Sequence, residues 1–562
     1  MLFELGLVAA VSLLALFFPR LGESAFRKVE STLARCAARK GLAIGASFLL
    51  AIALRLAVLP IEPIPTPAVH DEFSYLLMAD TFAHGRLTNP TPAVWQHFET
   101  FHENMRPTYC SKFFPVQGVL LAAGQVVVGH PFWGIVLSLG LMAAATCWSM
   151  QGWMPPAWAL LGALLVTAHF GVFGYWANSY WGGTVAACGG ALVIGALPRL
   201  KRQPKKNDAI VLAIGLMVLA NSRPYEGLIF CIPVLVLLML SWVRKRNWAM
   251  ITRQVILPVA AMIACAAASM GYYFWRTTGK PYLPPYAVYS ATYDSVPFVP
   301  WRALHPIPSY NNGAMRRFYL GFVQYQYLLY RNTPLPSIIG RVFNLWWFFV
   351  GFLLTVPFLA VCFVLPYGMR FKDFSIKTRE IFLVTTVGVI SVTPIVFFGQ
   401  HYAAPATCAV YILIMYCMRR IWVWKRHHNS RGRSIIRGLV LASIFLVLGH
   451  VAALCFRLSP MWISTEAASE LEAARPQVLS SLQNLDGTHL VLVRYSSDHN
   501  PHEEWVYNGA ALENARVIWA RELDPSSNQQ LIKHFKDRRV WLLQPDKIPP
   551  KLESYEVSAR EP

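Results

Sequence analysis

Apolar residues along the chain are gathered into runs of about 20 residues, the length that an α-helix needs to cross a hydrocarbon layer of roughly 30 Å. Runs of this kind predict membrane-spanning helices at residues 2–18, 41–59, 131–150, 158–176, 184–197, 255–275, 343–365, 381–398, 407–418 and 438–455. A longer tract, 209–243, is interrupted by polar residues 221–227 and predicts two helices that meet at this elbow. The pattern therefore predicts an all-α polytopic membrane protein with about a dozen spans.

The last hundred or so residues have a different pattern, typical of a soluble domain. Residues 465–482 have helical spacing, whereas 489–494, 505–508, 516–520 and 540–543 predict short strands, with a helix at 529–535 between the last two. The segment 498–504 holds histidines and carboxylates, but their spacing is not that of a metal site, and a solvated loop is the preferred interpretation. We expect a small α/β domain.

Composition and charge agree with the membrane interpretation and add an orientation. Of 562 residues, 55% are hydrophobic and only 14% are charged, which is too little polar surface for a soluble globule. The formal charge of +21 comes largely from clusters at 20–40, 201–206, 244–253 and 419–437, all on one side if the spans alternate. Because basic loops stay cytoplasmic, topology explains this charge and no nucleic-acid partner is needed.

This orientation places both termini and two long connections, 61–115 and 276–340, on the outer face. We therefore expect three regions: a membrane helix with a basic cytoplasmic loop (1–40), the main membrane domain (41–456) and an extracytoplasmic α/β domain (457–562). The first run carries Glu4 and lacks a basic leader, so it should stay as a span. The expected location is a bacterial inner membrane, with the outer connections on the periplasmic or extracellular side.

The first outer connection carries the most informative chemistry, a carboxylate pair in the segment from His70 to Leu77. On a helix, Asp71 and Glu72 point about 100° apart, so one can act as a base while the other supports it. Tyr75 falls on the same stripe as Asp71. The alternative interpretation makes the pair a helix cap and a first-turn acid, which the helix dipole would favour.

Two cationic side chains are candidates for anion binding. Lys112 stands among aromatic residues where the chain returns to the membrane, although an interfacial lysine that snorkels toward water has the same pattern. Arg223 lies in the elbow between two apolar helices, where a charge is costly unless it meets an anion or lines a polar cavity. It could instead pair with Glu226.

Other polar residues of the outer connections allow more than one interpretation. His97, Glu99 and His102 lack the i, i+4 spacing of a helical metal site, so hydrogen bonding to a polar substrate or a plain surface is preferred. The tyrosine-rich and proline-rich residues 281–293 suit either sugar stacking or an interfacial aromatic belt.

Asp71-Glu72 with Tyr75 in the first outer connection, followed by Lys112 and Pro115, resembles the GT-C superfamily of membrane glycosyltransferases. The likeness is to the branch of protein O-mannosyltransferases and aminoarabinose transferases, which has an Asp-Glu pair and a Lys-Pro-Pro motif. It covers the layout of residues 41–456. One departure is that Lys112 is followed by Phe113-Phe114-Pro115 rather than by two prolines, which weakens the transfer of a role to Lys112.

The resemblance implies transfer of a sugar, with inversion, from a polyprenyl-phosphate donor to an acceptor hydroxyl of a glycan, lipid or protein. It implies that Asp71 is the general base, supported by Glu72. Donor-phosphate binding is assigned to Lys112 and Arg223, and substrate binding to His70, Tyr75, His102 and Tyr109. Membrane lipids are further partners. No cofactor is implied, and a divalent metal is left open.

Two other classes of function compete with an enzyme. A transporter or flippase also needs many helices and a few buried charges, but it usually shows broken helices in matching halves. Here one broken pair, at 221–227, has no counterpart in the second half. A scaffold for envelope assembly, with the C-terminal domain as its binding module, is the third class.

Overall fold

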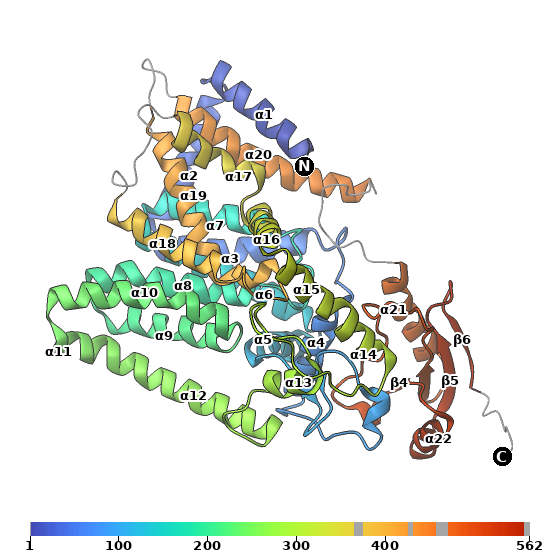
Figure 1. The fold of residues 1–562 in the computed structure, drawn as a ribbon. Helices are drawn as coiled ribbons and strands as arrows, with labels where there is room; N and C mark the ends of the chain where they lie inside the picture. The colour runs from blue at the N-terminus through green and yellow to red at the C-terminus, as the bar shows by residue number, and fades with distance from the viewer. Residues whose placement is uncertain (1, 365–374, 425–430, 457–469, 556–562) are drawn as a thin grey trace.

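The computed structural model describes residues 2–364, 375–424, 431–456 and 470–555. Helices form a large bundle, and a small sheet domain packs at one end of it (Figure 1). The earlier helices are α1 (Leu2–Phe17), α2 (Glu23–Ala38), α3 (Lys40–Ala57), α4 (His70–Ala83), η1 (Trp95–Phe98), α5 (Pro115–Val128), α6 (Phe132–Trp153), α7 (Pro156–Phe170), α8 (Thr184–Arg202), α9 (Lys206–Ala220), α10 (Pro224–Lys245), α11 (Trp248–Ile251), η2 (Thr252–Ile256) and α12 (Leu257–Thr278). The later helices are α13 (Pro285–Tyr293), α14 (Gly313–Arg317), η3 (Phe318–Val323), α15 (Gln324–Asn332), α16 (Pro334–Phe349), α17 (Gly351–Leu359), η4 (Ala360–Val364), α18 (Ile376–Ile390), η6 (Gln400–Ala406), α19 (Thr407–Trp422), α20 (Arg431–Cys455), α21 (Glu470–Gln483), η7 (Leu512–Asn514) and α22 (Pro525–His534). The strands are β1 (Glu103–Asn104), β2 (Cys110–Ser111), β3 (His489–Val493), β4 (Val517–Arg521), β5 (Arg539–Gln544) and β6 (Lys551–Ser554).

The protein is an integral membrane protein whose described part holds 7 helices long and apolar enough to cross a membrane, or up to 8 if one bent pair counts as a span. Helices α1, α5 and α7 are shorter apolar helices. The mostly helical architecture is thus confirmed, whereas a count of about a dozen spans stays a prediction. In the long run Trp248–Thr278 only 11% of the apolar window is buried by protein, so this helix presents its sides to lipid.

The bent pair corrects the single span expected at 343–365, of which residue 365 lies outside the described part. Helix α16 ends at Phe349 and α17 begins at Gly351, and the two are bent by 95°. Gly351 has φ 61°, a left-handed conformation that breaks the helix and that glycine adopts without strain. Glu4 of α1 accepts a hydrogen bond from the N–H of Leu353 (3.0 Å), which satisfies one donor that the break exposes.

Helix α5 is an apolar helix that the hydropathy pattern did not separate from its neighbours. It packs between α4 and α6. The approach to α6 is close, because a Cβ atom on Gly124 would lie 2.2 Å from the backbone N of Gly134. Small residues at such crossings let two membrane helices touch through their backbones. Helix α5 therefore anchors α4, which carries the carboxylate pair, to the bundle.

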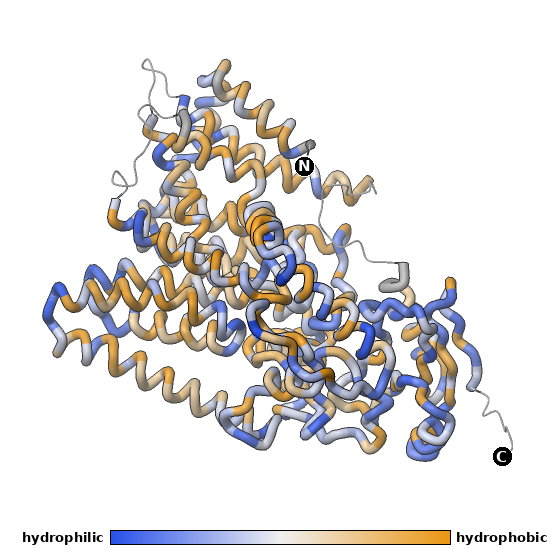
Figure 2. Tube along the Cα trace, in the orientation of Figure 1, coloured by the Kyte–Doolittle hydropathy of each residue, from blue (hydrophilic) through white to orange (hydrophobic). Residues whose placement is uncertain are grey.

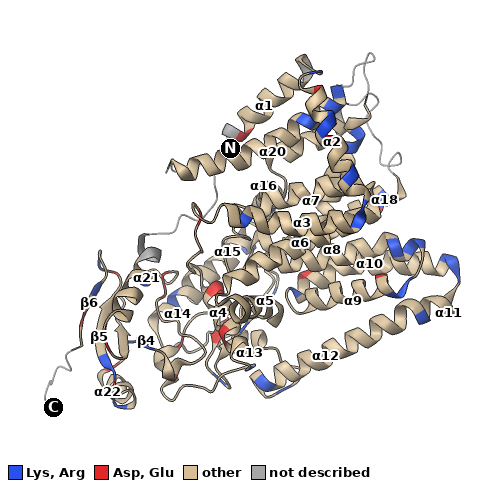
Figure 3. Ribbon diagram, turned by 180° about the vertical axis from the view of Figure 1, so that it is seen from behind, with Lys and Arg blue, Asp and Glu red and all other residues tan. Residues whose placement is uncertain are grey.

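Polar residues and basic residues are concentrated in different parts of the molecule. The bundle helices are mainly apolar, and polar residues concentrate in the connections and the sheet domain (Figure 2). Lys and Arg gather on α2 and near α11 and α18, at the end of the bundle away from the sheet domain (Figure 3). The basic segment expected as a loop at 20–40 contains an amphipathic helix, α2, whose Glu30 pairs with Arg437 at 2.7 Å.

The C-terminal domain is a four-stranded sheet in the order β4-β3-β5-β6, with β3 parallel to both neighbours and β5 antiparallel to β6. Three of the expected strands and the intervening helix α22 are confirmed, and β6 was not expected. The helix expected at 465–482 is described from Glu470 onward, and 465–469 lie outside the described residues.

The strand expected at 505–508 is wrong. Side chains take up its backbone groups: Tyr495 accepts the N–H of Trp505 (2.8 Å), and Arg475 donates to the carbonyl of Tyr507 (2.9 Å). The segment therefore leaves the sheet and lies against the membrane domain.

Candidate active site

The site is built on the N-terminal turn of α4, where Glu72 fixes the backbone. Its Oε2 accepts the N–H groups of Ala68 (2.8 Å) and Val69 (3.2 Å), and its Oε1 accepts the N–H of Tyr180 (2.8 Å). Burial raises the pKa of Glu72 to about 7, against the three N–H groups that favour its charged form. Glu72 thus ties the start of α4 to the segment before α8, as a supporting carboxylate would.

Asp71 points elsewhere and keeps 24% of its side chain exposed, whereas Glu72 is almost fully buried. Burial raises the pKa of the Asp71 carboxyl, and the positive charges of Lys112 and Arg223 act in the opposite direction. Its Oδ2 lies 3.7 Å from Nε2 of His102. The carboxylate is therefore a partly accessible base with two cations in its neighbourhood.

Lys112 has its ammonium in a box of aromatic rings. The nitrogen lies 4.7 Å from the ring centre of Tyr289, 5.2 Å from that of Phe113 and 5.3 Å from that of Tyr286. Burial lowers the pKa of Lys112, against the charges of Asp294 and Asp71. Among the described residues it forms no ion pair at 4.0 Å or less. An ammonium held this way has charge available for an incoming anion.

Arg223 precedes the first residue of α10, and its guanidinium lies 4.5 Å from the ring centre of Tyr402. The pairing with Glu226 considered from the sequence is not a direct contact: no ion pair at 4.0 Å or less joins the two in the described structure. Lys112 and Arg223, which come from two distant segments, thus both lie near enough for their positive charges to act on the Asp71 carboxyl.

The predicted substrate-binding residues Tyr75 and His102 line this place. Tyr75 lies flat on Phe113, with ring centres 4.5 Å apart, and burial raises its pKa to about 12. The carbonyl of His102 accepts the hydroxyl of Ser74 (2.6 Å), and its N–H donates to the hydroxyl of Tyr289 (2.8 Å). His102 is therefore held by α4 on one side and by α13 on the other.

His70 connects the site to the C-terminal domain. Its Nδ1 lies 2.7 Å from the hydroxyl of Tyr507, and its ring stacks on Phe101 at 4.2 Å. Burial lowers the pKa of His70 to about 3, so the ring is neutral at physiological pH. Tyr507 also stacks on Phe73 of α4, with ring centres 4.0 Å apart and planes at 1°. Tyr507 was missed because it lies 437 residues from His70 and no local pattern marks such a contact.

Other polar residues of the first connection serve the same domain contact or the second connection. Tyr109 donates to the carbonyl of Asn508 (3.0 Å), and both ring nitrogens of His97 lie close to carbonyls of the C-terminal domain. Glu99 accepts the hydroxyl of Tyr293 (2.8 Å) and the amides of Asn311 and Asn312. Tyr109 is thus not brought together with Asp71, and its substrate-binding role stays a prediction. In the part of the chain that the structure describes, no group of three or more His, Cys, Asp or Glu side chains is placed to hold a metal ion.

Comparison with known proteins gives a likeness in fold. No model of a known protein family matches the chain, and no curated protein matches its sequence. Two solved structures of ArnT from Cupriavidus metallidurans are similar to it, one bound to undecaprenyl phosphate and one in the apo state. Their TM-scores are 0.47 and 0.46 at 13% identity, and the match covers 88% of this chain and 92% of each ArnT chain.

Proposed function

We propose that the protein is a membrane glycosyltransferase that moves a sugar from a polyprenyl-phosphate-linked donor to an acceptor hydroxyl at the outer face of the membrane. The observation that carries this proposal is the meeting of a partly exposed carboxylate, Asp71, with two cations, Lys112 and Arg223. A base near anion-binding groups is what a displacement reaction with a phosphate leaving group requires. Undecaprenyl phosphate, bound in one ArnT structure, is a lipid of the proposed class.

The proposed reaction is a single displacement. Asp71 takes the proton of the acceptor hydroxyl while the hydroxyl oxygen attacks the anomeric carbon, and the bond from this carbon to the phosphate oxygen breaks. Attack opposite to the leaving group inverts the anomeric centre. Lys112 and Arg223 stabilise the charge that returns to the phosphate, so no separate acid is needed. A positioned general base contributes typically about 10²- to 10⁴-fold to the rate.

We further propose that the site faces the periplasmic or extracellular side of a bacterial inner membrane. Lys and Arg concentrate at the end of the bundle away from the sheet domain (Figure 3), and basic connections stay cytoplasmic. Helix α4 and the C-terminal domain then lie on the outer face. In this arrangement the shorter helices α1, α7, α9 and α18 also cross the membrane, and together with the long helices and the bent pair they give about a dozen crossings.

Replacement of Asp71 by Asn tests the proposal. We expect sugar transfer from membrane lipid donors to fall by at least about 100-fold, because the amide cannot accept the proton. Envelope glycans, glycolipids and glycoproteins from cells with either form are compared by mass spectrometry, and transfer is measured with purified protein. Asp80→Asn on the same helix is the matched control, because its amide oxygen can accept the N–H of Ala510 (2.7 Å) and its NH₂ group can donate to the side-chain amide of Gln125, which can turn its oxygen toward it. Unchanged transfer by Asp71→Asn, with normal membrane insertion, contradicts the assignment.

A further inference from the structure

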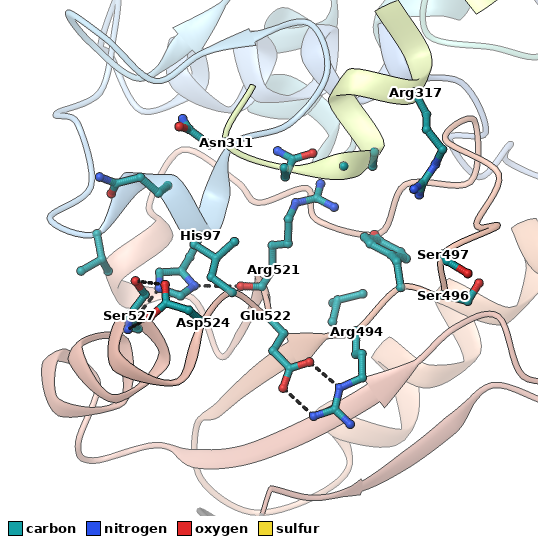
Figure 4. A pocket seen from close by; sticks show the side chains of 18 of the residues that line it. His97, Asn311, Arg317, Arg494, Ser496, Ser497, Arg521, Glu522, Asp524 and Ser527 are labelled. Carbon is teal, nitrogen blue, oxygen red and sulfur yellow. Dashed lines mark hydrogen bonds and ion pairs between the residues drawn. The ribbon is translucent and has the colours of Figure 1, made fainter. Parts of the chain in front are cut away.

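A cavity of about 700 Å³ lies beside the C-terminal domain, and Asp71 is not among the residues that line it (Figure 4). Four parts of the chain line it: the first outer connection near His97, the residues at the start of α14, the ends of β3 and β4, and helix α22. These two parallel strands finish at the cavity with Val493 and Arg521. The carboxyl ends of parallel strands are the edge at which open α/β sheets usually bind ligands.

The cavity wall carries hydrogen-bond donors and acceptors side by side. Arg494 and Glu522 line the cavity as an ion pair, and Arg521, which is paired with Glu504 behind it, lines the cavity as well. Serine and amide side chains from these four parts add further polar groups: Ser496, Ser497, Ser527, Gln96, Asn311 and Gln530. A sugar hydroxyl donates one hydrogen bond and accepts others, so such a wall suits a polyhydroxylated ligand better than an apolar one.

Arg317 is a cation of the wall with unused hydrogen-bonding capacity. Its Nε is buried without a hydrogen-bond partner, and among the described residues its guanidinium forms no ion pair at 4.0 Å or less. The side chain reaches toward the loop of Ser496 and Ser497 (Figure 4). Gln530, on the opposite element α22, is exposed and also lines the cavity. Two independent elements thus present polar groups to the same space.

The cavity and the candidate active site are neighbours. Arg317 lines the cavity, and the next residue, Phe318, has its ring 5.4 Å from that of His70 and 6.3 Å from that of His102. Arg521 lines the cavity, and its partner Glu504 lies in the same segment as Tyr507, which contacts His70. Side-chain contacts through Phe318 and His102 thus connect the cavity wall with Asp71, whose Oδ2 lies 3.7 Å from Nε2 of His102.

We propose that this cavity binds a non-reacting saccharide unit of the acceptor, so that the acceptor is a glycan of at least two sugar units. That the saccharide belongs to the acceptor rests on the proposed transferase function. That the cavity binds a saccharide rests on the cavity alone. The remote unit holds the acceptor while another unit presents its hydroxyl to Asp71. Recognition away from the reacting atoms would give the enzyme its preference for one glycan.

The test measures binding separately from transfer. Full-length Asp71→Asn protein in detergent is immobilised and exposed to oligosaccharides released from the envelope of cells that lack the protein, and retained glycans are quantified by mass spectrometry. We expect retention of a glycan of two or more units. Adding Arg317→Gln or Gln530→Ala should lower its retention about tenfold, since a lost hydrogen bond to a charged or polar group is worth this order of affinity.

Matched controls stand next to each tested residue. Arg316→Gln and Gln529→Ala alter exposed neighbours that do not line the cavity, and they should leave retention unchanged. The proposal is overturned if no oligosaccharide is retained, or if Arg317→Gln and Gln530→Ala both retain it as well as their controls. Arg317 and Gln530 lie on different elements, so if one variant misfolds, the other still tests whether the cavity binds the glycan. Failure of the proposed transferase function shows separately, as full transfer activity of Asp71→Asn alone.

Discussion

Replacing Glu72 by Gln changes one oxygen of the carboxylate to an NH₂ group and leaves the shape intact. The two oxygens of Glu72 accept three backbone N–H groups, two on Oε2 and one on Oε1. The single oxygen of glutamine can accept the N–H groups of Ala68 and Val69, or it can accept the N–H of Tyr180, but it cannot accept all three. At least one buried N–H group then faces an NH₂ donor and stays unsatisfied, which costs about 1–3 kcal/mol.

The neighbouring substitution Asp71→Asn should give the opposite result. Asp71 is partly exposed, and its Oδ2 lies 3.7 Å from Nε2 of His102, beyond hydrogen-bonding distance. We expect its effect on the free energy of unfolding to stay within about 0.5 kcal/mol, as for most surface substitutions. Transfer, in contrast, should be lost. The two substitutions would thereby distinguish the adjacent carboxylates: Glu72 supports the fold, and Asp71 supports the reaction.

The assay compares both variants with the unchanged protein in the same detergent. Unfolding is followed by tryptophan fluorescence against increasing denaturant, and transfer is measured at saturating donor on the fraction that remains folded. The reasoning is refuted if Glu72→Gln leaves stability unchanged. It is equally refuted if folded Glu72→Gln loses transfer as completely as Asp71→Asn, since Glu72 would then act in the chemistry itself.

Three further predictions follow from the geometry of the site and of its supporting helices. The rate of transfer against pH should fall on the acid side with a pKa above the ordinary 3.8 of Asp71, because the base must be deprotonated. The rate should fall on the alkaline side with a pKa below the ordinary 10.5 of Lys112, because the cation must be protonated. The variant Lys112→Met should abolish this alkaline fall. A fall on the acid side with a pKa at or below 3.8 contradicts the assignment of Asp71 as the base. Tyr507→Phe removes the hydrogen bond to His70 and should cost about 1 kcal/mol of stability and slow transfer, measured by unfolding and by kinetics; no change in either would show that the C-terminal contact does not position α4. Gly124→Ala should destabilise the protein by about 1–3 kcal/mol in an unfolding assay, since the added methyl group meets the backbone of α6 at 2.2 Å, and an unchanged midpoint would refute this close packing.

Much of the membrane fold was predictable because hydrophobic length is a strong local signal. The signal fails where the chain bends without a change in hydropathy. The break at Gly351 depends on a positive φ and on the distant carboxylate of Glu4, neither of which alters the apolar character of the run. Helix α5 lies between a loop and a span and is shorter than a membrane crossing, so the hydropathy pattern did not predict it as a separate helix.

The different directions of the Asp71 and Glu72 side chains were predictable from the rotation of about 100° per helical residue, and their separate roles stay a prediction. The aromatic box around Lys112 was not, because Tyr286 and Tyr289 come from the second outer connection and only the fold brings them to the ammonium. The same holds for Tyr507, whose segment has the alternation of a strand but uses side chains to satisfy its backbone. Contacts between distant segments determine the surroundings of Lys112 and the conformation of the segment around Tyr507. No local pattern in a single sequence indicates such contacts.

The contact between His70 and Tyr507 has a consequence for biosynthesis. Helix α4 is made early, yet the hydroxyl that meets His70 belongs to a residue 437 positions later, after the last membrane helix. Chains emerge from the ribosome with their N-terminal parts first, at about 5–20 residues per second. The surroundings of α4 are therefore completed only after the final domain has been made and folded. A nascent or truncated chain would hold Asp71 at the start of α4 without Tyr507 beside His70 and Phe73.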